Sequence, residues 1–295
     1  MADRTKRLDS NVAGNFFVDS TCINCDTCRQ LARESFEEVG DFSAVFRQPE
    51  GARQVHQAYQ ALLACPVGSI GTEEGDQAAL RQARAGFPMP LDDGVFYCGF
   101  NSEKSFGANS FFIEHPDGNW LIDSPRYLAQ LVEAFERKGG IRYIFLSHED
   151  DVADSDRYAA RFHATRIIHQ GDAAAVPGAE RIVDGQEAIQ LAAQFQAIPV
   201  PGHTPGSMAL LYDEKFLFTG DHLWWNPGSE SLGAPERLVW RKRALLASLE
   251  KLLAYRFEWV LAGHGDRVKL PPTQMQAQLR RLVDQRSSRP ATRSA

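Results

Sequence analysis

Cysteine is the residue type whose spacing carries the most chemical information in this chain. Cys22, Cys25 and Cys28 are three positions apart, and Cys65 comes much later, directly before Pro66. A C-x2-C-x2-C loop folds back on itself, so its three thiolates can converge on one iron–sulfur cubane while a remote Cys-Pro supplies the fourth ligand. The spacing predicts one [4Fe-4S] cluster. A structural zinc site stays open as the alternative, because four thiolates also suit Zn²⁺.

The sequence around these cysteines resembles single-cluster bacterial-type ferredoxins. The matching segments are Val18-Asp19-Ser20-Thr21-Cys22-Ile23-Asn24-Cys25-Asp26-Thr27-Cys28 and Ala64-Cys65-Pro66-Val67-Gly68-Ser69-Ile70. The resemblance covers residues 12–74 and implies an α+β ferredoxin-like cluster domain with an electron-transfer partner. The fifth cysteine, Cys98, is expected to be a small buried apolar residue.

A second group of ligand-type side chains comes at the ends of apolar segments. The fragments are Leu146-Ser147-His148, Pro201-Gly202-His203-Thr204-Pro205-Gly206, Thr219-Gly220-Asp221-His222 and Ala262-Gly263-His264-Gly265. Loops that leave one edge of a sheet can converge, so these side chains are candidates for one site. A single histidine of this kind would be read as a hydrogen-bonded core residue, whereas four such elements in order indicate a metal centre.

The order of these fragments, together with Ile122-Asp123-Ser124-Pro125, resembles the metallo-β-lactamase superfamily and in particular its glyoxalase II-like branch. The resemblance spans about residues 94–268 and implies an αββα sandwich (metallo-β-lactamase-like) domain with a metal site at one edge. By position, His148 and His203 match ligands of a first metal. Asp221 matches the carboxylate that bridges two metals, and His264 matches a ligand of the second.

The first histidine loop departs from the superfamily pattern H-x-H-x-D-H. Asp150 takes the place of the second histidine, and the expected Asp-His pair is absent. Either Asp151 or, through a two-residue insertion, Asp154 is expected to take the place of the missing aspartate. The alternative is that Asp151 is the N-cap of the following helix and Asp154 the acid three residues on. The loop reads His148-Glu149-Asp150-Asp151-Val152-Ala153-Asp154.

These residues favour a metal-dependent hydrolase of an ester, thioester or similar acyl substrate. His148, Asp150 and His203 would hold the first metal, and Asp221 and His264, with Asp154, the second. His222 is a candidate for proton transfer, with packing as the alternative. One or two Fe, Zn or Mn ions are expected, since oxygen ligands beside imidazole suit Fe or Mn better than an all-histidine pocket does.

Two other functions stay open. An aspartate at the second ligand position is similar to the flavodiiron branch of the superfamily, which implies an iron-dependent oxidoreductase that receives electrons from the ferredoxin domain. The third reading is a non-enzymatic redox sensor. Pocket shape sets the identity of a small-molecule substrate, so the sequence does not give it.

The elements that must position these residues fall into two domains. In the first, helices are expected at 31–36 and 52–64 and a strand pair around 42–46. Residues 75–94, rich in Gly and Pro around one short helix, are expected to be a linker to a domain at 95–285. There the pattern predicts a hairpin of 110–113 and 120–122, a helix over 127–138 and a strand at 143–146. Residues 286–295 are expected to be a disordered tail.

Composition excludes other classes of function. With 38 acidic and 32 basic residues among 295, the formal net charge is −6, which argues against nucleic-acid binding. The longest stretch without charge contains Gln, Pro and His, so no membrane span is expected. The N-terminus has charged residues without an apolar block behind them, so no secretory signal is expected and the cytoplasm is the predicted location.

Overall fold

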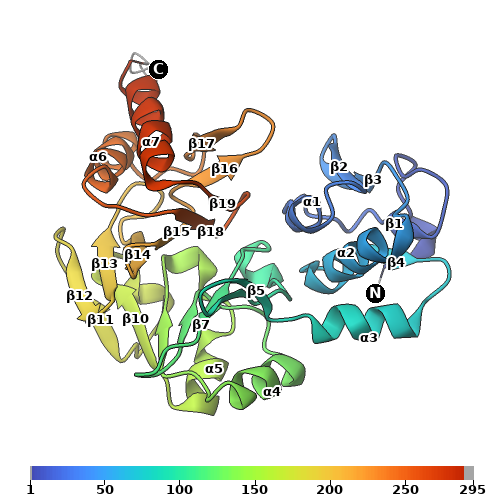
Figure 1. The fold of residues 1–295 in the computed structure, drawn as a ribbon, viewed down its shortest axis with the longest axis horizontal. Coiled ribbons are helices and arrows are strands. Elements are labelled where there is room, and N and C mark those ends of the chain that lie inside the picture. The colour runs from blue at the N-terminus through green and yellow to red at the C-terminus, as the bar shows by residue number, and fades with distance from the viewer. Residues whose placement is uncertain (1, 289–295) are drawn as a thin grey trace. The chain divides into compact units, whose positions relative to one another are not determined.

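A computed structural model describes residues 2–288 of the chain (Figure 1). The chain divides into two compact units. The first holds the chain up to Ile144 together with Asp150–Ala164, and the second holds Phe145–Glu149 together with the chain from Thr165. This division differs from the expected boundary around residues 75–94, which stays a prediction. Each unit is described by itself.

The first unit begins with the cysteine-containing segment. Strand β1 (Phe16–Val18) pairs antiparallel with β4 (Ile70–Thr72), which brings the two cysteine segments together. The helix expected at 52–64 is confirmed as α2 (Gly51–Ala64), which ends directly before Cys65. The helix expected at 31–36 is wrong: α1 (Thr27–Leu31) ends earlier, and Phe36 starts a hairpin of β2 (Phe36–Val39) and β3 (Phe42–Val45).

The segment 75–94 contains the one short helix that was expected there, and also a strand. Helix α3 (Gln77–Ala85) is capped by the Asp76 carboxylate, which accepts hydrogen bonds from two backbone N–H groups of its first turn. Strand β5 (Met89–Asp92) then pairs antiparallel with β6 (Val95–Tyr97). Residues 75–94 therefore include a helix and an edge strand of a sheet.

The sheet of the first unit continues in chain order. The expected hairpin is confirmed as β7 (Phe111–Ile113) and β8 (Trp120–Ile122), with β6 beside β7 and β9 (Tyr143–Phe145) beside β8. Helix α4 (Ala129–Arg137) ends at Gly139 and Gly140, both with positive φ, and the Gly140 N–H donates to Phe135 O. The remaining elements are η1 (Arg4–Lys6), η2 (Glu103–Ser105) and α5 (Ser155–Phe162).

The second unit contains the sheet that carries most of the candidate site. Its strand order is β12-β13-β14-β15-β18-β19 in the described part of the chain. These strands are β12 (Ile189–Ala192), β13 (Phe195–Pro199), β14 (Met208–Tyr212), β15 (Phe216–Gly220), β18 (Trp259–Ala262) and β19 (Val268–Lys269). The other elements are the parallel pair β10 (Thr165–His169) and β11 (Arg181–Val183), η4 (Gln170–Ala175), and the hairpin of β16 (Trp224–Asn226) and β17 (Ser231–Gly233). The short helix η3 (Glu149–Asp151) follows His148.

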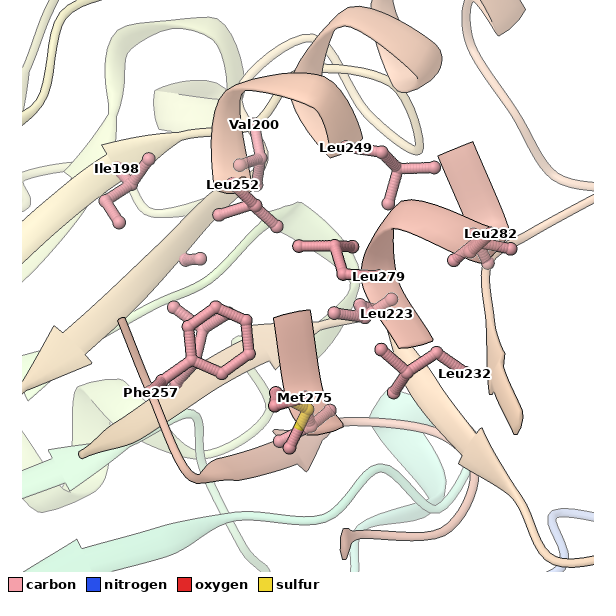
Figure 2. Packing of buried hydrophobic residues seen from close by; sticks show 14 of the residues in the cluster. Ile198, Val200, Leu223, Leu232, Leu249, Leu252, Phe257, Met275, Leu279 and Leu282 are labelled. Atoms are coloured by element: carbon pink, nitrogen blue, oxygen red, sulfur yellow. The ribbon is translucent and has the colours of Figure 1, made fainter. Parts of the chain in front are cut away.

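Helices α6 (Lys242–Leu252) and α7 (Pro272–Ser287) lie side by side in the second unit (Figure 1). Figure 2 shows Leu249 and Leu252 of α6 facing Leu279 of α7, and all three are fully buried. Burying one such side chain contributes about 1.5–3 kcal/mol, so this layer is a main source of stability for the second unit. Because α7 continues to Ser287, the start of the expected disordered tail is helical, and residues 289–295 lie outside the described part.

None of the helices within residues 2–288 combines the length and the apolar composition needed to span a membrane.

Candidate cluster site and metal centre

The first site is the group of four cysteines in the first unit. Cys22, Cys25, Cys28 and Cys65 line one common pocket, and all four are free thiols. Several donors point at their sulfur atoms. The Asn24 and Ser43 N–H groups each lie 3.4 Å from Cys22 Sγ. The hydroxyls of Thr27 and Ser69 lie 3.4 Å from the sulfurs of Cys25 and Cys65.

This donor set fits an iron–sulfur cluster. Burial raises the pKa of the Cys25 thiol to about 11 and raises that of Cys28 further. Buried thiols of this kind become thiolates only when a metal takes the place of the proton. Hydrogen bonds to the sulfurs then stabilise the negative charge and help to set the reduction potential. Cys98 is fully buried and does not line this pocket, in agreement with its expected packing role.

The second site lies in the second unit, where two histidines converge on one carboxylate. Asp221 Oδ2 is 3.7 Å from His148 Nε2 and 3.6 Å from His203 Nε2. One donor atom from each of the three residues lies within 4.8 Å of the others. Ligand atoms bound at about 2.0–2.2 Å to one tetrahedral ion are separated by roughly 3.3–3.6 Å, so small movements would bring this group to metal geometry.

His264 joins the same carboxylate from the end of β18. Its Nδ1 lies 2.8 Å from Asp221 Oδ1, and its backbone N–H donates to that oxygen at 3.1 Å. Burial would raise the pKa of Asp221, but the positive charge of His264 and hydrogen bonds from His148 and His264 hold it well below its ordinary value. Asp221 is therefore an anion in reach of three imidazoles.

His148 and His203 are both oriented through the ring nitrogen that does not approach Asp221. His203 Nδ1–H donates to Leu238 O at 2.6 Å, which fixes the tautomer with a lone pair on Nε2. His148 Nδ1 lies 2.9 Å from the Ser147 hydroxyl. Such bonds to the outer nitrogen hold an imidazole ready to bind a metal.

Gly220 makes the approach of Asp221 to the His148 loop sterically feasible. Its φ is +49°, and a Cβ built there would lie 2.5 Å from Ser147 Oγ and 3.3 Å from His148 Nδ1. Any side chain at position 220 would displace the His148 loop. Glycine is therefore required directly before Asp221 if Asp221 is to lie close to His148.

Asp172 is a supporting residue that the sequence reasoning missed. Its carboxylate is fully buried and accepts hydrogen bonds from Glu149 N at 3.1 Å, Gly206 N at 2.8 Å and the Thr204 hydroxyl. Glu149 follows His148, while Thr204 and Gly206 belong to the His203 loop. One buried anion thus connects the two histidine loops. The available signal was an aspartate just after the end of a strand, next to Gly171.

The acidic residues of the His148 loop differ in their burial and in their contacts. Asp150 is exposed. Asp151 is fully buried. Asp154 Oδ1 pairs with Lys104 Nζ at 2.7 Å, and its Oδ2 accepts the Tyr127 N–H at 2.9 Å. The capping alternative is wrong, because the N-cap residue of α5 is Asp154 itself and its side chain makes no capping hydrogen bond.

His222 is buried and directly follows Asp221 in the chain. Both of its ring nitrogens are without a hydrogen-bond partner within residues 2–288. Burial, aided by the positive charges of His203 and Lys251, lowers the pKa of His222 to about 3. A histidine in this state is neutral at physiological pH, which supports the packing alternative over proton transfer.

Asp154→Ala is expected to reduce stability without changing the metal content of the second unit. Because the Lys104 side chain is 65% exposed, its ion pair with Asp154 contributes little to stability. The main effect is the loss of the acceptor for the Tyr127 N–H, and we expect the free energy of unfolding in urea to fall by about 1–2 kcal/mol. Burial raises the pKa of Asp154, but Lys104 and Tyr127 outweigh it and hold the pKa below its ordinary value. The stability difference is therefore complete above the unfolded-state pKa of about 3.9 and is lost as pH falls through the folded-state pKa.

The matched control for this variant is Asp156→Ala, an exposed acid in the same helix. Its effect should stay within about 0.5 kcal/mol. Loss of metal from Asp154→Ala with little loss of stability would instead identify Asp154 as a ligand.

Comparisons with known proteins agree with this two-part architecture. A family model described as metallo-beta-lactamase superfamily matches residues 91–283, and one described as 4Fe-4S single cluster domain of ferredoxin I matches residues 18–72. Both resemblances inferred from the sequence are thereby confirmed.

Individual proteins are also similar to this chain. Hydroxyacylglutathione hydrolase of Acidiphilium cryptum is 29% identical over 160 residues, which are 52% of this chain and 63% of that protein. The enzyme of the same name from Xanthomonas oryzae pv. oryzae is 28% identical over 152 residues, 50% of this chain and 57% of that protein. The chain thus spans about three-fifths of the length of these curated relatives.

A solved structure shows the same fold. The metallo-β-lactamase FIM-1 from Pseudomonas aeruginosa, in its mono-zinc form, aligns with a TM-score of 0.50 and 18% identity. The alignment covers 68% of this chain and 95% of that protein. The expected metallo-β-lactamase-like fold class is confirmed.

Proposed function

Because the chain belongs to the metallo-beta-lactamase superfamily, we propose that it is a metal-dependent hydrolase of an ester, thioester or similar acyl substrate. The observation that carries this proposal is the approach of His148 Nε2 and His203 Nε2 to the same oxygen of Asp221. Two oriented imidazoles and an anionic carboxylate are a donor set that suits Zn²⁺, Fe or Mn.

The residues have separate roles in this proposal. His148 and His203 would hold the first metal, and Asp221 and His264 would hold the second. A metal held there would lower the pKa of its bound water to about 7 and would polarise the substrate carbonyl. Asp221, kept anionic by its histidine neighbours, is the group placed to orient the attacking water.

The acidic residues of the His148 loop complete the ligand set in different ways. The buried carboxylate of Asp151 supports it as the acid of the second position. Asp150 remains the proposed further ligand of the first metal on its sequence position. Asp154 is engaged by Lys104 and Tyr127, so we leave it out of the proposed set.

The relatives support the substrate class proposed for the first test. Both curated relatives are named hydroxyacylglutathione hydrolases, so an S-acyl thioester of a small thiol is the first substrate to test.

The Asp172 carboxylate, through its bonds to Glu149, Thr204 and Gly206, keeps both histidine loops in place during turnover.

A second candidate function is an oxidoreductase that receives electrons through the cluster. It is favoured by hydrogen bonds, within the first unit, between the cysteine loop and residues of the metallo-β-lactamase domain. Thr27 Oγ1 donates to Gly107 O at 3.3 Å, and Asn101 Nδ2 donates to Thr27 Oγ1 at 3.1 Å. A cluster bound by this cysteine loop would supply electrons to an iron site in the metallo-β-lactamase domain.

One experiment distinguishes the two functions. The full chain, purified without oxygen, is analysed for Fe, Zn and Mn and assayed for cleavage of S-acyl glutathione thioesters, with Asp221→Asn as the inactive reference. Thioester cleavage that is independent of the oxidation state of the cluster supports the hydrolase. No cleavage, together with a second iron that is reduced through the cluster, would contradict it and support the oxidoreductase.

A further inference from the structure

Arg126 reaches the cluster site from outside the ferredoxin segment. Its Nη2 donates to Leu63 O at 2.9 Å and to Cys65 O at 3.2 Å, at the end of helix α2. The backbone of Arg126 is fixed on both sides, because its N–H donates to Phe100 O at 3.0 Å and its carbonyl accepts the Tyr158 hydroxyl at 2.8 Å. The guanidinium is therefore held beside a cluster ligand by a rigid part of the first unit.

This guanidinium lacks an acidic partner. Within residues 2–288, Arg126 forms no ion pair with a carboxylate, and its buried Nε has no hydrogen-bond partner. Burial lowers the pKa of Arg126. Burying part of a cation without a counter-charge costs free energy of folding, and an anion close to the Arg126 guanidinium would offset that cost.

The four-cysteine site supplies that anion once it is loaded. Four thiolates around an oxidised [4Fe-4S]²⁺ core carry a net charge of −2, and one-electron reduction makes it −3. We propose that Arg126 is the counter-ion of the cluster and raises its reduction potential. In the reduction, one electron passes from a one-electron donor to the core, and no bond forms or breaks. A fixed cation stabilises the more negative reduced state more than the oxidised state.

The contact between Arg126 and Cys65 joins two segments of the chain that different family models match. Arg126 belongs to the segment matched by the metallo-β-lactamase family model, whereas Cys65 belongs to the ferredoxin segment. Reduction of the cluster strengthens its attraction to the Arg126 guanidinium. By linkage, the guanidinium raises the reduction potential by the same free energy. The potential is thus set partly by a residue that lies outside the segment matched by the ferredoxin family model.

The test is a redox titration of the full chain, followed by the EPR signal of the reduced cluster. Arg126→Gln should keep the four irons but raise the oxidised-to-reduced ratio at a fixed potential about tenfold, a shift of 59 mV to lower potential. Arg126→Lys, which keeps the charge, should stay close to the wild type. The matched control is Arg53→Gln, since Arg53 is an exposed residue of α2 that is paired with Glu34.

Iron loading and the midpoint potential of the two Arg126 variants decide the proposal. A loaded Arg126→Gln protein with a wild-type midpoint would overturn the proposal. If Arg126→Gln fails to load iron, the lysine variant decides: loading with a wild-type midpoint supports the role of the charge. Failure of both variants to load would show that the guanidinium is needed for its hydrogen-bond geometry and would overturn it.

Discussion

Asp221→Asn should abolish metal binding in the second unit while the protein stays folded and keeps its cluster. Asn has nearly the same shape but lacks the negative charge that His148, His203 and His264 all face. Residues that only support ligands cost about 10–100-fold in metal affinity when replaced, so loss of this central carboxylate should exceed about 100-fold. Metal analysis of the purified variant and calorimetric titration with Zn²⁺ measure the effect, and thioester cleavage should fall with it.

The matched control for Asp221→Asn is Asp213→Asn. Asp213 lies in the exposed turn between β14 and β15 of the same sheet. It should bind metal as the wild type does. A normal metal content in Asp221→Asn would contradict the proposed centre.

Cys65→Ser should remove the iron–sulfur cluster. A serine oxygen is a poor substitute for a thiolate ligand. Cys65 is the proposed fourth ligand of the cluster, beside the triplet Cys22, Cys25 and Cys28. The anaerobically purified wild type should be brown with about four irons per chain in this site, and the variant should be colourless. Iron and sulfide analysis, with the visible spectrum, gives the measurement.

Cys98→Ser is the control for this change, because Cys98 is buried away from the four-cysteine pocket. Its iron content should equal that of the wild type even if its stability is lower. A colourless wild-type protein with one zinc ion in the four-cysteine site would show that the zinc alternative holds.

The sequence predicts the two candidate sites better than the contacts that support them. Cysteine spacing identifies the first site because the four sulfurs need only a short loop and one returning segment. His148, His203, Asp221 and His264 could be selected because each comes at the end of an apolar strand. The structure brings these four donors together, whereas Asp172 and Arg126 depend on distant backbone groups that have no sequence periodicity.

Local structure was missed where tertiary contacts override the local pattern. Residues 31–36 have helical propensity, yet Phe36 pairs with Val45 in a hairpin and is buried. In segment 75–94 the one helix was expected but the strand was not, because Gly and Pro surround that helix in the sequence. Its strand β5 forms because β6 offers an unpaired edge, which is not visible from the segment alone.

The position of Asp172 has a consequence for how this part of the molecule opens. Its one carboxylate bonds to Glu149 N in one loop and to Gly206 N in the other. When either loop detaches, the buried anion loses part of its hydrogen bonding, and the remaining loop loses part of what holds it closed. Local unfolding of the two loops is therefore cooperative, and the amide protons of Glu149 and Gly206 should exchange with solvent as one unit.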